Sequence, residues 1–193
     1  MDIQPVTLTG QYVYLEPVAD KHIAGLFAIG QNADDWCYMP RPCFQSIEDT
    51  AGWVNEFKHA ADTGQGLCFV IRSLTTKQVL GSSSYLNVRH KDRGLEIGYT
   101  WMAKKAQRTA ANTEAKLLLL THAFESLNAI RVEFKTDARN QRSQKAISRI
   151  GAQKEGVFRN HMIVQNGYVR DSVYFSIVAE EWLAVKSKLK AML

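Results

Sequence analysis

Residues 107–112, Gln-Arg-Thr-Ala-Ala-Asn, are the part of the sequence whose residue types first suggest chemistry. They lie between an alternating strand pattern at 94–102 and a leucine-rich helix pattern that continues to about residue 127. The first N–H groups of a helix have no intrahelical acceptor and lie at the positive end of its dipole, so such a turn can bind phosphate. The stretch matches neither a Walker loop nor G-x-G-x-x-G. By spacing alone it is also compatible with an ordinary helix start.

Glu96 is the candidate general base. The alternation of strand 94–102 predicts two faces, one with Leu95, Ile97, Tyr99 and Trp101 and the other with Glu96, Gly98, Thr100 and Met102. A carboxylate next to a glycine has open space beside it, and partial burial would raise its pKa toward the working pH. The alternative is a glutamate on a solvated face, paired with Arg89 or Arg93.

Ser143 is the candidate proton donor. Asn140, Ser143 and Ile147 are spaced i, i+3 and i+7 in a helix pattern over 140–150, so they share one face. The alternative is that Asn140 caps the helix and Ser143 is an ordinary serine of its first turn.

Covalent catalysis by Ser143, His161 and Asp171 is the main chemical competitor. A two-residue hairpin turn at 166–167 predicts Asp171 opposite Met162, so Asp171 and His161 should point to different faces. Ser143 also lacks the G-x-S-x-G context of a nucleophile elbow. These patterns argue against a triad.

Metal binding is not expected. The five histidines show no ligand spacing, and the three cysteines contain no C-x-x-C pair. We expect His122, inside the leucine-rich helix, to be a core histidine. The tryptophans and other aromatic residues of the N-terminal part should pack its helices together.

The surrounding patterns predict one domain over residues 1–193 with an α/β (mixed α+β) fold. Strands are predicted at 12–18, 67–71, 79–88, 94–102, 130–136, 157–164 and 169–178. Helices are predicted at 21–29, 46–60, 140–150 and from 180, and a further helix opens with the stretch 107–112 and continues to about 127. Strands 94–102 and 130–136 are the one forced parallel pair, because a helix connects them. A mixed sheet with helices on both faces follows.

Charge and composition indicate which kinds of molecule this protein can bind. The chain has 24 Lys+Arg against 19 Asp+Glu, a net charge of +5, which suits an anionic partner. No apolar run approaches the ~20 residues that cross a bilayer, and the first residues lack a signal-peptide pattern. With an odd number of cysteines, we expect a cytoplasmic protein without membrane partners.

An ordered series of segments resembles the GNAT N-acetyltransferase superfamily, in particular its RimJ/RimL-type branch. Residues 107–112 resemble the family loop [Q/R]-x-x-G-x-[G/A]. Further matching segments lie at 95–99, 112–118, 131–137, 140–152, 155–159 and 170–173. The resemblance extends from about residue 7 to 182, and no single motif carries it.

The resemblance implies a splayed, mostly antiparallel sheet of six or seven strands that binds acetyl-CoA. It implies that the amides of 107–113 hold the pyrophosphate and that the backbone at 100–102 pairs with pantetheine. The implied cofactor-binding residues are Thr100, Trp101, Met102, Gln107, Arg108, Thr109, Ala110, Ala111, Asn112, Thr113 and Asn140.

The sequence departs from the family pattern at three positions. Ala110 replaces the family glycine and Asn112 stands at the [G/A] position. Ala110 keeps its N–H, so phosphate binding survives if its φ is negative. Ile147 stands where many relatives have a proton-donating tyrosine, which leaves Ser143, one turn earlier, as the donor.

The implied reaction is direct acetyl transfer from acetyl-CoA to a primary amine, with Glu96 as base and Ser143 as acid. The acceptor could be a protein N-terminus, an amino acid, a polyamine or an antibiotic, and a homodimer is compatible with the resemblance. The alternative is a non-catalytic CoA-sensing or ribosome/RNA-associated binding module. The chain has no RNA-reading motif, which argues against a nucleic-acid partner.

Overall fold

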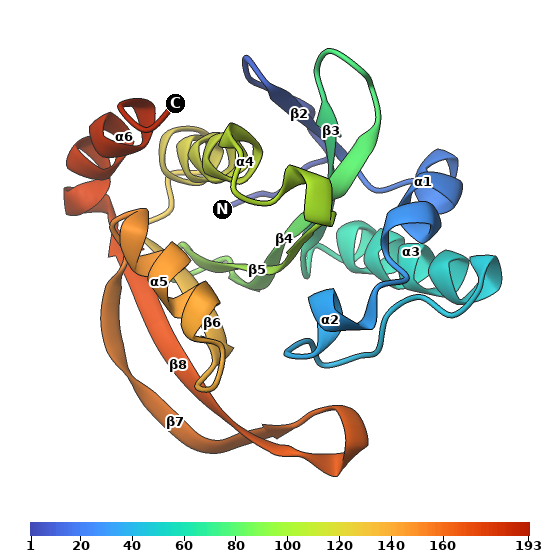
Figure 1. The fold of residues 1–193 in the computed structure, drawn as a ribbon. Coiled ribbons are helices and arrows are strands. Elements are labelled where there is room, and N and C mark those ends of the chain that lie inside the picture. The colour runs from blue at the N-terminus through green and yellow to red at the C-terminus, as the bar shows by residue number, and fades with distance from the viewer.

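A computed structural model describes all residues, 1–193, and contains one eight-stranded sheet in the order β1-β2-β3-β4-β5-β6-β8-β7 (Figure 1). The strands are β1 (Leu8–Thr9), β2 (Val13–Pro17), β3 (Leu67–Ser73), β4 (Val79–Arg89), β5 (Gly94–Met102), β6 (Arg131–Asp137), β7 (Gln153–Ile163) and β8 (Val169–Val178). The α-helices are α1 (Ile23–Ile29), α2 (Ala33–Trp36), α3 (Ile47–Asp62), α4 (Ala110–Thr121), α5 (Gln141–Arg149) and α6 (Trp182–Lys190). Each helix is too short or too polar to span a bilayer.

The strand order confirms the predicted mixed, mostly antiparallel sheet, with the two-residue β1 as an eighth strand that the sequence patterns do not predict. Only β5 and β6 run parallel, and they pair over three positions, from Gly94 with Arg131 to Glu96 with Glu133. Beyond Glu96 the two strands separate. The sheet therefore opens at its centre.

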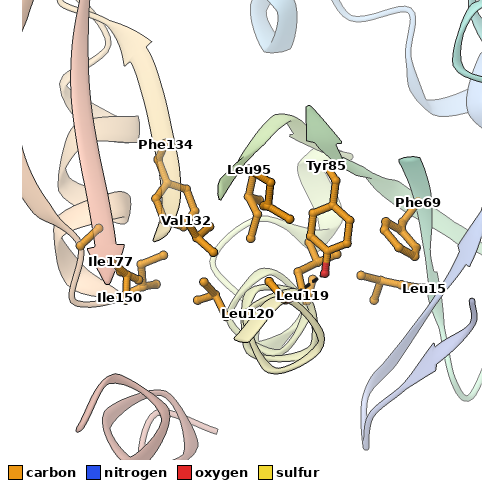
Figure 2. Close-up of a cluster of buried hydrophobic side chains, with 14 of the residues drawn as sticks. Leu15, Phe69, Tyr85, Leu95, Leu119, Leu120, Val132, Phe134, Ile150 and Ile177 are labelled. Carbon is orange, nitrogen blue, oxygen red and sulfur yellow. Dashed lines mark hydrogen bonds between the residues drawn. The ribbon is translucent and has the colours of Figure 1, made fainter. Parts of the chain in front are cut away.

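Helix α4 covers one face of the sheet on both sides of this opening. Its buried Leu119 and Leu120 point toward Leu95 of β5 and Val132 of β6, as Figure 2 shows, and Tyr85 of β4 donates a hydrogen bond to the Leu119 carbonyl at 2.7 Å. Because α4 packs on strands from both halves, its apolar burial joins the halves where backbone pairing has ended.

Helices α1–α3 cover the opposite face of β3–β5 (Figure 1). Ser46 caps α3 by accepting a hydrogen bond from the Asp49 amide at 3.1 Å. An aromatic cluster joins these helices to β5, with Trp36 and Trp101 rings 4.9 Å apart. The expectation that these aromatics serve packing is confirmed. His122, beyond α4, is half-buried and contacts the Tyr85 hydroxyl at 3.2 Å, and burial lowers its pKa, so it lies at the border of the core and not within it as predicted.

The alternation predicted for β5 is wrong beyond Gly98. Tyr99 has a φ of 47°, and the register with β4 shifts in this region. This bulge turns Tyr99 and Trp101 toward the α1–α3 side, whereas Leu95 and Ile97 face α4. Thr100 consequently faces α4, and Glu96 points to the other side.

The register predicted for the β7–β8 hairpin is also wrong. Met162 pairs with Arg170 instead of Asp171, because the connection is longer than a two-residue turn and places Asn166 at a φ of 58°. A further irregularity between Phe158 and Met162 shifts the rest of the pairing. Asp171 accepts a hydrogen bond from the Asn160 amide at 2.7 Å and does not contact His161, which removes the triad.

A buried carboxylate anchors α4 to the first strands. Both oxygens of Glu114, which is 2 % exposed, accept backbone N–H groups of Gln11, Tyr12 and Val13 at 2.6–2.7 Å. A Cβ at Gly10 would lie 2.3 Å from the Glu114 side chain, so only glycine fits there. One side chain thus satisfies three amides and fixes α4 on the sheet.

We expect Glu114→Gln to lower the free energy of unfolding by about 2–3 kcal/mol, because an uncharged amide replaces the acceptor of three N–H groups. Urea denaturation measures this loss, with Glu180→Gln on the exposed surface as the matched control. Equal unfolding midpoints for the two variants would contradict the anchoring role.

Candidate functional site

The edge of β5 that faces β6 is the first part of the site. Since pairing with β6 ends at Glu96, the backbone from residue 97 to 102 has no strand partner on this side, while its other edge pairs with β4 through Trp101 and Met102. An unpaired strand edge offers N–H and C=O groups to an extended ligand. The predicted residues Thr100, Trp101 and Met102 all lie on this edge.

The N-terminus of α4 is the second part. The amides of residues 108–110 and 112 precede the first intrahelical bond and have no acceptor in the protein, whereas the Ala111 amide donates to Thr109 Oγ1 at 3.2 Å. Ala110 begins the helix and has no positive φ, so its methyl group needs no strained backbone. Four free N–H groups at one helix start form a site suited to a phosphate or diphosphate.

Polar side chains support this turn. Gln107 donates to Asp35 of α2 at 2.8 Å and to the Met102 carbonyl at 3.0 Å, so it ties the turn to β5 and the N-terminal half. Arg149 of α5 donates to Thr113 Oγ1 at 2.8 Å. The Asn112 side-chain oxygen is enclosed and has no donor.

Glu96 is the third part, and it is only 2 % exposed. Its Oε2 accepts from Asn87 at 2.7 Å and pairs with Lys135 at 3.0 Å, so neither Arg89 nor Arg93 is its partner. A Cβ at Gly98 would lie 2.7 Å from Oε1, so the glycine keeps this oxygen accessible. One oxygen is thus held by two donors while the other is without a hydrogen bond.

Ser143 and Asn140 lie at the start of α5, which is on the α4 side of the sheet, where Ile147 and Ile150 join the same core. Asn140 caps α5 by accepting from the Ser143 amide at 2.9 Å, so the capping interpretation is confirmed. The Ser143 hydroxyl is half-buried and has no hydrogen-bond partner. It is therefore available to a ligand from the α4 side, whereas Glu96 serves the opposite side.

On the face of the sheet that carries Glu96, the tip of the β7–β8 hairpin contacts the segment 36–41, an arrangement that sequence patterns do not identify. Gln165 at the tip of the β7–β8 hairpin donates to the carbonyls of Trp36, Met39 and Arg41 at 2.7–2.8 Å. Arg139 lies 3.5 Å from the ring centre of Tyr168 in the same tip. These contacts join segments more than 120 residues apart, which no local pattern signals.

A cavity of about 520 Å³ lies between α3, the loop before it and Tyr99 of β5, and Arg41, which contacts the hairpin tip, is among its lining residues. Burial raises the pKa of Tyr99, and the field of Glu56 adds to that shift. His, Cys, Asp and Glu side chains nowhere form a group of three or more that could hold a metal ion.

Lys116 on α4 is a second feature that the sequence analysis missed. It is 7 % exposed and has no carboxylate partner; its Nζ donates to Thr100 Oγ1 at 2.6 Å and Ser83 Oγ at 3.0 Å. These bonds fix the bulged part of β5 against α4. Burial lowers the pKa of Lys116 to about 7. The sequence does contain a signal for this buried lysine, because Lys116 directly precedes the four leucines of the helix.

Comparison with known proteins identifies the family to which this chain belongs. The family described as "Acetyltransferase (GNAT) domain" matches residues 13–153, and the chain belongs to this family. The protein is therefore an acetyltransferase, and the fold that it shares uses acetyl-CoA.

Individual relatives agree with the RimJ/RimL-type branch. YdaF of Bacillus subtilis, named as a candidate ribosomal N-acetyltransferase, is 37% identical over 102 residues, which are 53% of this chain and 55% of YdaF. A GCN5-related N-acetyltransferase from Brucella melitensis superposes with a TM-score of 0.92 and 27% identity over 99% of this chain and 86% of its own. Mycobacterium smegmatis RimJ, solved with CoA-disulfide, shares the fold with a TM-score of 0.83 and 24% identity, over 98% and 97% of the two chains.

The buried Lys116 predicts a pH dependence of stability. The unfolded chain holds the lysine proton up to its usual pKa of 10.5, while the folded protein releases it near pH 7. Between these values the unfolded state binds more protons, so the stability contribution rises with pH. The unfolding free energy of the wild type relative to Lys116→Met should increase from pH 7 to 10. Parallel pH curves would contradict this, and the exposed Lys188→Met is the control.

Proposed function

We propose that the protein transfers an acetyl group from acetyl-CoA directly to a primary amine, either a small molecule or a protein N-terminus. The observation that carries this proposal is the combination of an open β5 edge with free amides at the start of α4. The free amides within residues 107–113 would hold the pyrophosphate, the backbone at 100–102 would align the pantetheine, and Asn140 would add a side-chain amide. Acetyl-CoA supplies the thioester that is broken.

Glu96 is the base in this proposal. Its free Oε1 takes a proton from the acceptor ammonium, directly or through water, so that the nitrogen lone pair can attack the thioester carbon. Lys135 and Asn87 hold Oε2 and thereby fix the direction of Oε1. The base lies on the side of the sheet opposite α4, so the amine approaches from the side of the β7–β8 hairpin.

Ser143 is the acid. Its unbonded hydroxyl gives a proton to the sulfur when the C–S bond breaks, and it regains one from the second proton that leaves the acceptor nitrogen, directly or through water. Free thiol then leaves and the amide remains. The location of α5 on the α4 side supports this role, since the acid then acts from the side opposite the base. Ile147, at the position of the family tyrosine, has no proton to donate.

The proposal also includes a cellular compartment, the cytoplasm, and an oligomeric state, the homodimer. Three free thiols, at Cys37, Cys43 and Cys68, favour a reducing compartment such as the cytoplasm. A homodimer stays a prediction.

We expect Glu96→Gln and Ser143→Ala each to lower kcat for acetyl transfer by about 10²- to 10⁴-fold, because each removes one proton transfer. Thiol release in the presence of an amine mixture measures the rate. The exposed Glu180→Gln and Ser148→Ala are the controls. Unchanged rates in both site variants would contradict the assigned roles.

Acetyl-CoA should raise the melting temperature of the wild type and of both variants, since the amides and the β5 edge remain. Differential scanning fluorimetry measures this shift. Stabilisation by acetyl-CoA without any thiol release from the wild type would contradict the enzyme proposal and favour a CoA-sensing module.

A further inference from the structure

Arg170 of β8 is a buried cation without a carboxylate partner. It is 4 % exposed, and its Nε donates to Ser172 Oγ at 2.9 Å. Its two terminal nitrogens have no acceptor in the protein, and neither is among the fully enclosed atoms. They therefore retain some contact with solvent.

The arginines on or next to β4 and β6 on this face of the sheet are all paired, whereas Arg159 of β7 is exposed to solvent. Arg89 and Arg131 pair with Glu133 at 3.0 Å, and Arg139 pairs with Asp137 at 2.7 Å. A buried guanidinium is costly unless it is compensated, so an unpaired one is the exception that requires a reason.

The nearest negative charges are already used. Asp137 accepts two side-chain hydrogen bonds from Arg139, at 3.0 and 2.7 Å, and Glu96 is bound by Lys135. Burial lowers the pKa of Arg170, although the fields of Asp137 and Glu96 oppose that shift. The guanidinium thus lacks an anion of its own.

Arg170 and Glu96 border the same space. His161 contacts Ser172 at 3.0 Å and Tyr174 at 3.2 Å, which places it beside Arg170 on the same face of β8. Lys135, the partner of Glu96, lies opposite Tyr174 in the β6–β8 register. A series of contacts through Lys135, Tyr174, His161 and Ser172 therefore joins the base to the cation on one face of the sheet.

We propose that Arg170 binds a carboxylate of the acceptor, so that the enzyme selects amino acids over amines without an acid group. A guanidinium donates two parallel hydrogen bonds to a carboxylate, which would orient the acceptor with its amine toward Glu96. The inference rests on the proposed acetylation of amines and specifies the acceptor class of that site.

The test compares the wild type, Arg170→Gln and Arg170→Lys on a panel of free amino acids and their α-amides, which keep the amine and lack the acid. Thiol release from acetyl-CoA gives kcat/KM for each acceptor. The wild type should prefer the acids by about 10- to 100-fold, the range expected for a charged hydrogen bond. Arg170→Gln should abolish this preference while keeping activity on the amides, and Arg170→Lys should restore part of it.

The exposed Arg93→Gln, in the turn before β5 and near the far end of β8, removes the same charge at a distance and should keep the preference. If Arg170→Gln fails to fold, the wild type alone still decides: desamino acids, which have the carboxylate without the amine, should compete with acceptors and not with acetyl-CoA. Equal wild-type rates on acids and amides, or an equal loss on both in Arg170→Gln, would overturn the inference. No thiol release with any amine would instead overturn the proposed function.

Discussion

The short pairing between β5 and β6 is the constraint on which the rest of the structure depends. Three residue pairs hold two parallel strands together, and beyond Glu96 the backbone of β5 has one unpaired edge in the middle of the sheet. Such an edge is stable only where other elements hold the two halves together. Here Leu119 and Leu120 of α4 pack on both halves of the sheet. The two strands therefore stay paired from Gly94 to Glu96 and apart beyond it.

Polar contacts complete what apolar packing begins. Glu114 fixes α4 to the first strands through three amides, and Lys116 fixes the bulged part of β5 to the same helix. The helix whose start offers free N–H groups is therefore also the helix that defines the strand edge. One helix therefore fixes the position of its own first turn relative to the unpaired edge of β5.

The two faces of the sheet carry different polar side chains. Ser143 lies on the α4 side, whereas Glu96, Lys135 and Arg170 lie on the side of the β7–β8 hairpin. The bulge at Tyr99 exchanges the faces along β5, so residues before and after it serve opposite sides. In the proposed reaction, acetyl-CoA and the amine would approach from these two sides and meet where β5 and β6 separate.

The sequence by itself determined the element order, the parallel pair 94–102 and 130–136, the family and the α4 start, because these depend on local periodicity and on motifs in fixed order. It did not determine the faces of β5 beyond Gly98 or the hairpin register, because a single residue at positive φ reverses every side chain that follows it. Nor did it identify Lys135 as the partner of Glu96, or Arg170 as an unpaired cation. Pairing between charges depends on strands that are brought together only in the folded sheet, and only tertiary structure decides which of them remain without a partner.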